Sequence, residues 1–112
     1  MNLKDRTVLY TATFKANISE IVLYRRENIS PQNAADFLKE LQKAIQTIVK
    51  YPEANPIVRQ IPTKRNWYRF RIIKRRYKII FKVLKSKLVF IAIVHTSRDP
   101  KEVAKLRTRD YS

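Results

Sequence analysis

The residues best suited to chemistry are cations that alternate with aromatic and apolar side chains in one stretch of the chain. Trp67, Arg69 and Arg71 occupy every second position, so in a strand they would share one face, with successive side chains about 6–7 Å apart. Arginine binds phosphate through two parallel hydrogen bonds, and tryptophan offers a ring on which a base can stack. Further cations flank this row and would follow a phosphate backbone: Lys64, Arg65, Lys74, Arg75, Arg76, Lys78 and Lys82. The pattern predicts a polyanion-binding platform, with the solvent-facing half of an ordinary amphipathic strand as the alternative.

A second candidate group follows the apolar run Leu88–Val94. His95 comes directly after this run, and Arg98 lies three residues further on. Histidine is the side chain that exchanges protons near neutral pH. We therefore expect any proton transfer to take place here, and a purely structural histidine at a strand end is the alternative.

The positive charge is concentrated in one segment. The 112 residues include 25 Lys and Arg against 9 Asp and Glu, a net charge of +16. Residues 54–98 hold thirteen of these cations and no carboxylate. Unopposed charge destabilises a fold by self-repulsion and attracts polyanions, so the expected partner is nucleic acid or an acidic protein. Because carboxylates are missing, cleavage of RNA here would proceed without metal, with the 2′-hydroxyl as nucleophile and cations stabilising the charged phosphate.

The residue types that the chain lacks exclude several classes of protein. Without glycine there is neither a Walker A loop nor a dinucleotide-binding turn, and without cysteine there is no disulfide framework, zinc finger or thiol nucleophile. One histidine cannot build a multi-histidine metal site. We therefore expect no cofactor and no metal. The apolar run is far shorter than the roughly 20 residues that span a bilayer, and the N-terminus lacks a signal-peptide pattern, so we expect a cytoplasmic protein without a membrane partner.

Hydrophobic periodicity predicts the elements that position these residues. A β-rich segment at Thr7–Thr11 precedes a helix from about Phe14 to Asn28. Ser30 and Pro31 then form an N-cap signal for a strongly amphipathic helix of about five turns, which ends before Pro52. The remaining segments have β patterns, at 57–61, 66–73, 77–84 and 88–94, and Asp99–Pro100 opens a short terminal helix.

These elements predict one α+β domain over residues 1–112, in which an N-terminal strand and an antiparallel helical hairpin pack on a mostly antiparallel sheet of four to five strands. The helices are expected to cover the face that carries Tyr77, Ile79, Phe81 and Val83. The opposite face is expected to keep its basic residues exposed, with the Trp67, Arg69 and Arg71 row among them.

The order of these motifs resembles the RelE/ParE superfamily of type II toxin–antitoxin toxins. The resemblance runs from Thr7 to about Val103: "YTATFKANISEIVLY" is similar to the family's first strand and helix, and "NAADFLKELQKAIQTIVKYPEANP" to its second helix. The most specific parts are "WYRFRIIKRRYKIIFKV" and "LVFIAIVHTSRDP". The resemblance implies a toxin held inactive by a co-encoded antitoxin. RelE-like members cut mRNA in the ribosomal A site without metal, whereas ParE-like members poison DNA gyrase.

The resemblance also suggests roles for individual residues. Arg69 matches the hairpin arginine that acts on the scissile phosphate in RelE-like toxins, Arg98 matches the arginine after the last long strand, and His95 lies where some members place a catalytic or structural residue. RelE-like toxins often place a tyrosine or histidine shortly after that last arginine. Here Asp99–Pro100 follows, and the late candidate is Tyr111.

The sequence therefore leads to a ranked set of expectations. The first is a metal-free, ribosome-dependent mRNA endoribonuclease with Arg69, Arg71, His95, Arg98 and Tyr111 as catalytic candidates. The alternatives are a non-enzymatic inhibitor of DNA gyrase and a plain basic nucleic-acid-binding module. Under both toxin hypotheses, the endoribonuclease and the gyrase inhibitor, the chain would have an acidic antitoxin as partner.

Overall fold

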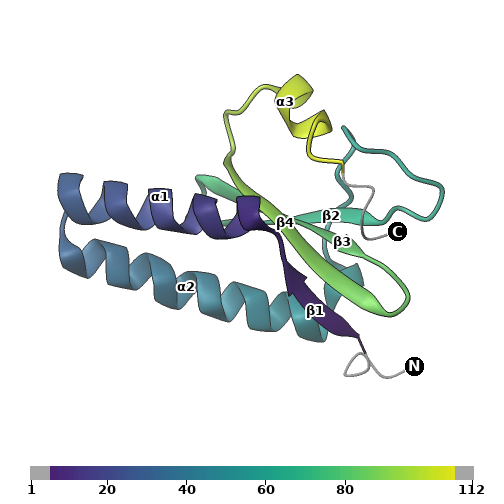
Figure 1. Cartoon of the computed structure of the whole chain (residues 1–112), viewed down its shortest axis with the longest axis horizontal. Helices are drawn as coiled ribbons and strands as arrows, with labels where there is room; N and C mark the ends of the chain where they lie inside the picture. Colours follow the sequence, from purple (N-terminus) through teal and green to yellow (C-terminus); the bar gives the residue numbers. More distant parts are fainter. Residues whose placement is uncertain (1–5, 108–112) are drawn as a thin grey trace.

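A computed structural model describes residues 6–107 as three α-helices packed on a four-stranded mixed sheet (Figure 1). The elements follow in the order β1 (Thr7–Tyr10), α1 (Ala12–Asn28), α2 (Pro31–Lys50), the 3-10 helix η2 (Pro52–Ala54), β2 (Tyr68–Ile73), β3 (Tyr77–Val83), β4 (Lys87–His95) and α3 (Pro100–Ala104). The strand order is β1-β4-β3-β2, with β1 parallel to β4 and the other pairs antiparallel. The predicted α+β architecture is confirmed, including the short C-terminal helix.

Both long helices begin at side-chain caps. The hydroxyl of Thr11 accepts a hydrogen bond from the backbone N–H of Phe14, so α1 starts two residues earlier than its apolar pattern predicted. The hydroxyl of Ser30 accepts from Asn33 at 3.0 Å, with Pro31 at the first helical position, as the sequence predicted. Among residues 6–107, no helix combines the length and apolarity needed to cross a membrane.

The helical hairpin covers the predicted sheet face. Ile79, Phe81 and Val83 of β3 pack with Phe37 of α2 and Phe14 of α1 in one buried cluster. The apolar run in β4 is buried on both faces of the sheet, again as predicted. An aromatic group formed by Tyr10, Phe14, Phe81 and Phe90 joins β1 and α1 to the centre of the sheet.

The opposite face of the sheet is covered rather than bare, which corrects the prediction. Val58 and Ile61, from the segment before β2, and Val103 of α3 pack there on Ile80 and Val89. The physical reason is that the Leu88–Val94 part of β4 is apolar at every position, so each face of the sheet needs a covering layer. The predicted strand at 57–61 is also wrong, because that segment forms one isolated bridge, Ile57 to Arg69, between two prolines that cannot donate to a ladder.

Candidate functional site

The β2–β3 hairpin carries the predicted arginines on the face that the helices cover. Arg69 pairs with Phe81 and Arg71 with Ile79, and paired residues point to the same side of a sheet. The expected exposed row of Trp67, Arg69 and Arg71 on the opposite face is therefore wrong. Arg69 and Arg71 share a face as predicted, but that face is the helical side, beside the exit of α2, and Trp67 packs on the other face.

Backbone carbonyl groups at that exit hold the two arginines. Nη1 of Arg69 donates to the carbonyl oxygens of Asn55 at 2.6 Å and Glu53 at 3.2 Å. Nη1 of Arg71 reaches Oδ1 of Asn55 at 3.5 Å. Asn55 is buried, and its amide donates to the carbonyls of Tyr51 and Pro52. Arg69 thus joins the end of α2 to the edge of the sheet.

The lysines of β3 lie on the other face, against aromatic rings. Nζ of Lys82 is 5.3 Å from the ring centroids of both Trp67 and Tyr68, and the residue is 1% exposed. Lys78 is half-buried, with Nζ 4.8 Å from the ring centroid of Phe70. Lys82 was predicted to contact nucleic acid, and its burial contradicts that, because the rings that attract the ammonium also shield it from a phosphate.

A second group of cations gathers at the turn between β2 and β3. Lys74 and Arg75 have φ angles of 54° and 59°, a conformation that costs about 1–2 kcal/mol for a residue other than glycine. Lys74 pairs with Glu40 of α2 at 3.2 Å, whereas Arg75 and Arg76 are exposed. The carbonyl of Arg76 accepts from the backbone N–H of Thr96 at 2.7 Å, which brings the turn against the segment after β4.

His95 and Arg98 are exposed at this same end of the sheet. The imidazole packs edge-on against Tyr77, with centroids 6.0 Å apart. Its Nδ1 lies 2.7 Å from Oγ of Ser97 and 3.1 Å from the backbone nitrogen of Ser97, so Ser97 fixes the orientation of the ring. The backbone N–H of Arg98 donates to the carbonyl of His95, which closes a tight turn and keeps the two residues near each other.

The predicted catalytic residues therefore form two groups rather than one. Ile73 of β2 pairs with Tyr77 of β3, which pairs with His95 of β4, so His95 lies two strands away from Ile73. Arg69 lies four residues before Ile73 along β2. At about 3.3 Å per residue and 4.8 Å per strand, the Cα atoms of Arg69 and His95 are about 16 Å apart. Tyr111 lies outside the described residues. Within residues 6–107, no three His, Asp or Glu side chains are grouped as a potential metal site.

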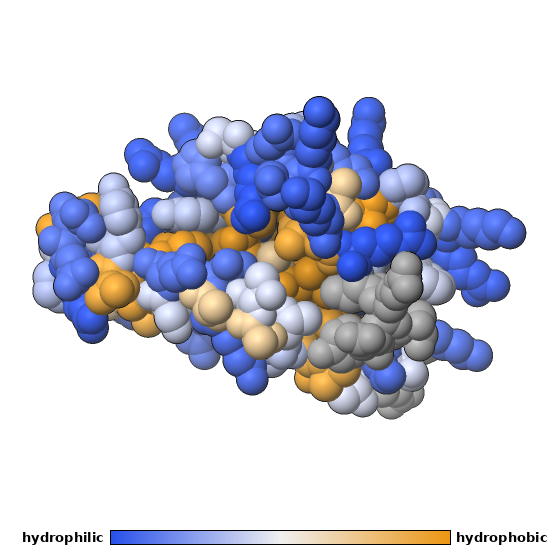
Figure 2. Space-filling model, turned by 45° about the horizontal axis from the view of Figure 1, so that its top comes forward, coloured by the Kyte–Doolittle hydropathy of each residue, from blue (hydrophilic) through white to orange (hydrophobic). Residues whose placement is uncertain are grey.

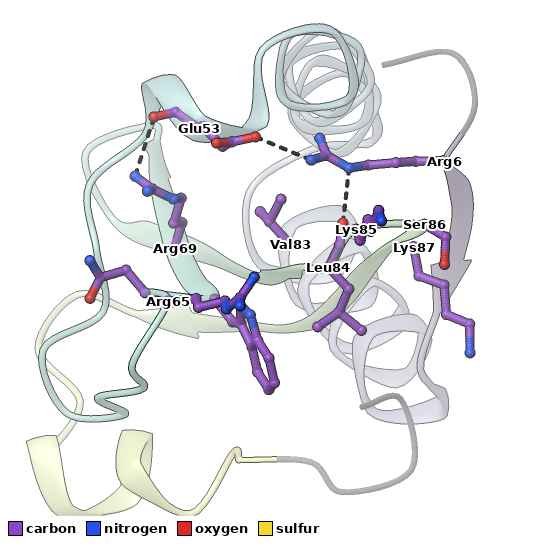
Figure 3. A pocket seen from close by; sticks show the side chains of 11 residues that line it. Arg6, Glu53, Arg65, Arg69, Val83, Leu84, Lys85, Ser86 and Lys87 are labelled. Carbon is purple, nitrogen blue, oxygen red and sulfur yellow. Dashed lines mark hydrogen bonds and ion pairs between the residues drawn. The ribbon is translucent and has the colours of Figure 1, made fainter. Parts of the chain in front are cut away.

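The loop cations Lys64 and Arg65 are exposed ahead of β2, and Arg65 borders a pocket that the sequence did not predict. Nε of Arg6 donates to the carbonyl of Leu84 at 2.9 Å, and its Nη2 lies 3.1 Å from Oε1 of Glu53. Figure 3 shows Arg6 and Arg69 meeting Glu53 from opposite sides. The sequence offered one weak signal for this pocket, which is that Glu53 is the last carboxylate before the cationic residues 54–98.

The free end of the helical hairpin has a different character. Leu23, Tyr24 and Ile29 are 45%, 61% and 57% exposed, and Figure 2 shows apolar surface at this end among hydrophilic side chains. Exposed apolar groups next to charged ones are typical of surfaces that bind other proteins. The chain therefore offers both a cationic surface and an apolar one.

Comparison with known proteins connects this geometry to a family. The model of the ParE toxin of the type II toxin–antitoxin system parDE matches residues 8–100. Among solved structures, the chromosomal ParDE toxin–antitoxin system from P. aeruginosa superposes with a TM-score of 0.65 at 13% identity, over 81% of this chain and 96% of that one. At that identity the likeness concerns the fold. No curated protein matches the sequence.

Proposed function

Because the chain belongs to the ParE toxin family of type II toxin–antitoxin systems, we propose that it arrests growth by binding DNA gyrase rather than by cutting RNA. Membership makes the chain the toxin of such a system, with a cognate antitoxin as its partner, and confirms the resemblance to the RelE/ParE superfamily. The plain nucleic-acid-binding module is set aside for the same reason. The choice between gyrase and mRNA then depends on the geometry of the predicted catalytic residues.

The observation that carries the proposal is the separation of those residues. Arg69 is engaged with the backbone at the end of α2, and the strand register with ideal strand spacing puts its Cα about 16 Å from that of His95. General acid–base catalysis on one phosphate needs the proton carrier and the charge-stabilising groups within hydrogen-bond reach of the same atoms. The arrangement favours a toxin that acts by binding its target.

The two surfaces suit a toxin with protein partners. The exposed cations at the β2–β3 turn attract an acidic surface and steer its approach, while the apolar hairpin end provides area for burial. An acidic antitoxin would neutralise the same positive charge. This accounts for a net charge of +16 on a chain that works inside a complex.

A supercoiling assay with purified gyrase and relaxed plasmid tests the proposal. The full chain is expected to inhibit supercoiling at near-stoichiometric amounts, and addition of the cognate antitoxin should restore it. Unchanged supercoiling at a large molar excess of toxin would refute the assignment. An in vitro translation reaction with mapping of mRNA ends, run in parallel, should show no new cuts.

One observation favours RNA cleavage as the second candidate. His95 presents an exposed imidazole beside the exposed Arg76 and Arg98, which together make a smaller group of proton carrier and cations. If this group cuts RNA, the wild type should produce new mRNA ends and the His95→Gln variant should not. Neither the wild type nor the variant should then inhibit gyrase. If the protein is a gyrase inhibitor, the wild type and the His95→Gln variant should inhibit supercoiling equally.

A further inference from the structure

A pocket lies at the end of the sheet away from His95, between the β3–β4 turn, Glu53 and the loop before β2 (Figure 3). Its volume is about 490 Å³, within the range of about 300–1,000 Å³ typical of small-molecule sites. Neither the proposed action on gyrase nor the second candidate uses it.

The lining is strongly cationic. Five positive side chains face one carboxylate, that of Glu53: they are Arg6, Arg65, Arg69, Lys85 and Lys87. The side chain of Arg6 is 8% exposed, and its Nη1 is buried without a hydrogen-bond partner among the described residues. That nitrogen is closed to solvent, and the other donors of Arg6 are held by Leu84 and Glu53, so Arg6 contributes its positive charge to the pocket wall.

The rest of the wall is apolar and aromatic. Trp67, Val83 and Leu84 line the pocket beside the cations. Nζ of Lys82 lies over the indole of Trp67 and holds the ring in place. A planar ring or a sugar can pack against this wall while the guanidinium groups bind the charge.

The geometry points to a binding site for a free nucleoside monophosphate, with the phosphate held by Arg65 and Arg69, attracted by the charge of Arg6, and the base packed against Trp67. The cations alone would accept any anion, and the apolar wall is what selects a phosphate that carries a base. The inference is independent of the toxin's target, since a nucleotide can bind here whether the protein acts on gyrase or on mRNA.

Binding of AMP, adenosine and inorganic phosphate to the full chain, measured by isothermal titration calorimetry, tests this site. AMP should bind at least tenfold more tightly than adenosine or phosphate, because each of those makes only half of the contacts. Trp67 is the single tryptophan of the chain, so its fluorescence should change with AMP in the same concentration range. Equal affinity for AMP and phosphate, or no binding of AMP, would overturn the assignment. So would binding of a short 5′-phosphorylated oligonucleotide without binding of AMP.

Two variants and a matched control locate the site. Arg65→Ala removes an exposed pocket cation and should weaken AMP about tenfold, the usual loss for a charge-assisted hydrogen bond. Glu53→Gln removes the one carboxylate and should tighten AMP severalfold. Arg26→Ala removes an exposed arginine of α1 outside the pocket, so it should leave AMP affinity within twofold. If Arg26→Ala weakened AMP as much as Arg65→Ala, the binding would reflect net charge and the site would be refuted.

Discussion

Replacement of Arg69 by alanine tests whether this arginine is a structural link. Its Nη1 donates to two carbonyl oxygens, those of Asn55 at 2.6 Å and Glu53 at 3.2 Å. A hydrogen bond from a charged donor contributes about 1.5–3 kcal/mol, and the 3.2 Å bond to Glu53 is the longer and more exposed of the two. We therefore expect Arg69→Ala to lower the free energy of unfolding by about 2 kcal/mol.

Thermal unfolding followed by circular dichroism measures this change. With an unfolding entropy of about 2.1 cal/mol/K per residue, a chain of 112 residues loses about 4 °C in Tm per kcal/mol, so the expected shift is about 8 °C. Arg71→Ala is the matched control, because its contact of 3.5 Å to Asn55 is too long for a strong hydrogen bond. The control should lose less than about 2 °C.

Two results would refute this reasoning. One is a Tm for Arg69→Ala within about 2 °C of the wild type, and the other is a larger loss for Arg71→Ala than for Arg69→Ala. The same variant bears on function. Mapping of mRNA ends with a folded Arg69→Ala protein should give the wild-type result, because Arg69 lies about 16 Å from the His95 group that the RNA candidate would use.

Three further predictions concern the stability of variants, measured by urea or thermal unfolding. Arg25 is buried, with its guanidinium carbon 5.3 Å from the ring centroid of Phe37, and no side-chain carboxylate pairs with it among the described residues. Arg25→Met, which keeps the stem, should therefore cost less than half of what Arg25→Ala costs, and equal losses would contradict this. Phe14→Ala opens a cavity at a fully buried site and should cost about 3–5 kcal/mol, so a loss below about 1 kcal/mol would show that the aromatic group is loosely packed. Arg75→Gly should raise the stability by about 0.5–1 kcal/mol because φ is 59° there, whereas Arg76→Gly, at a residue without positive φ, should lower it; the reverse order would contradict the turn geometry.

The path of the chain was predictable because its signals are local. The caps at Ser30 and Asp99, the amphipathic spacing of α2 and the alternation in β2 and β3 each depend on residues a few positions apart. The continuous apolar run in β4 likewise indicated a strand buried on both faces. These signals were enough for the element order and for the face on which the helices pack.

The arrangement of the cations was not predictable in the same way. Alternation shows that Arg69 and Arg71 share a face of the sheet. Which segment packs on that face depends on where residues 53–55 meet the sheet, and this is not encoded locally. The sequence predicts Lys82 at the surface, whereas in the structure it is buried against the rings of Trp67 and Tyr68. The pocket around Arg6 joins segments that are distant in sequence, and no local pattern records such contacts.

The sequence alone was sufficient for a basic α+β toxin fold, because propensity, capping and periodicity act between near neighbours. Tertiary packing assigned each cation its role, because burial and hydrogen bonding depend on the segment that covers a side chain. That is why Arg69 links the end of α2 to the sheet, Arg75 remains exposed, and Arg6 is held against Leu84 and Glu53 at the pocket.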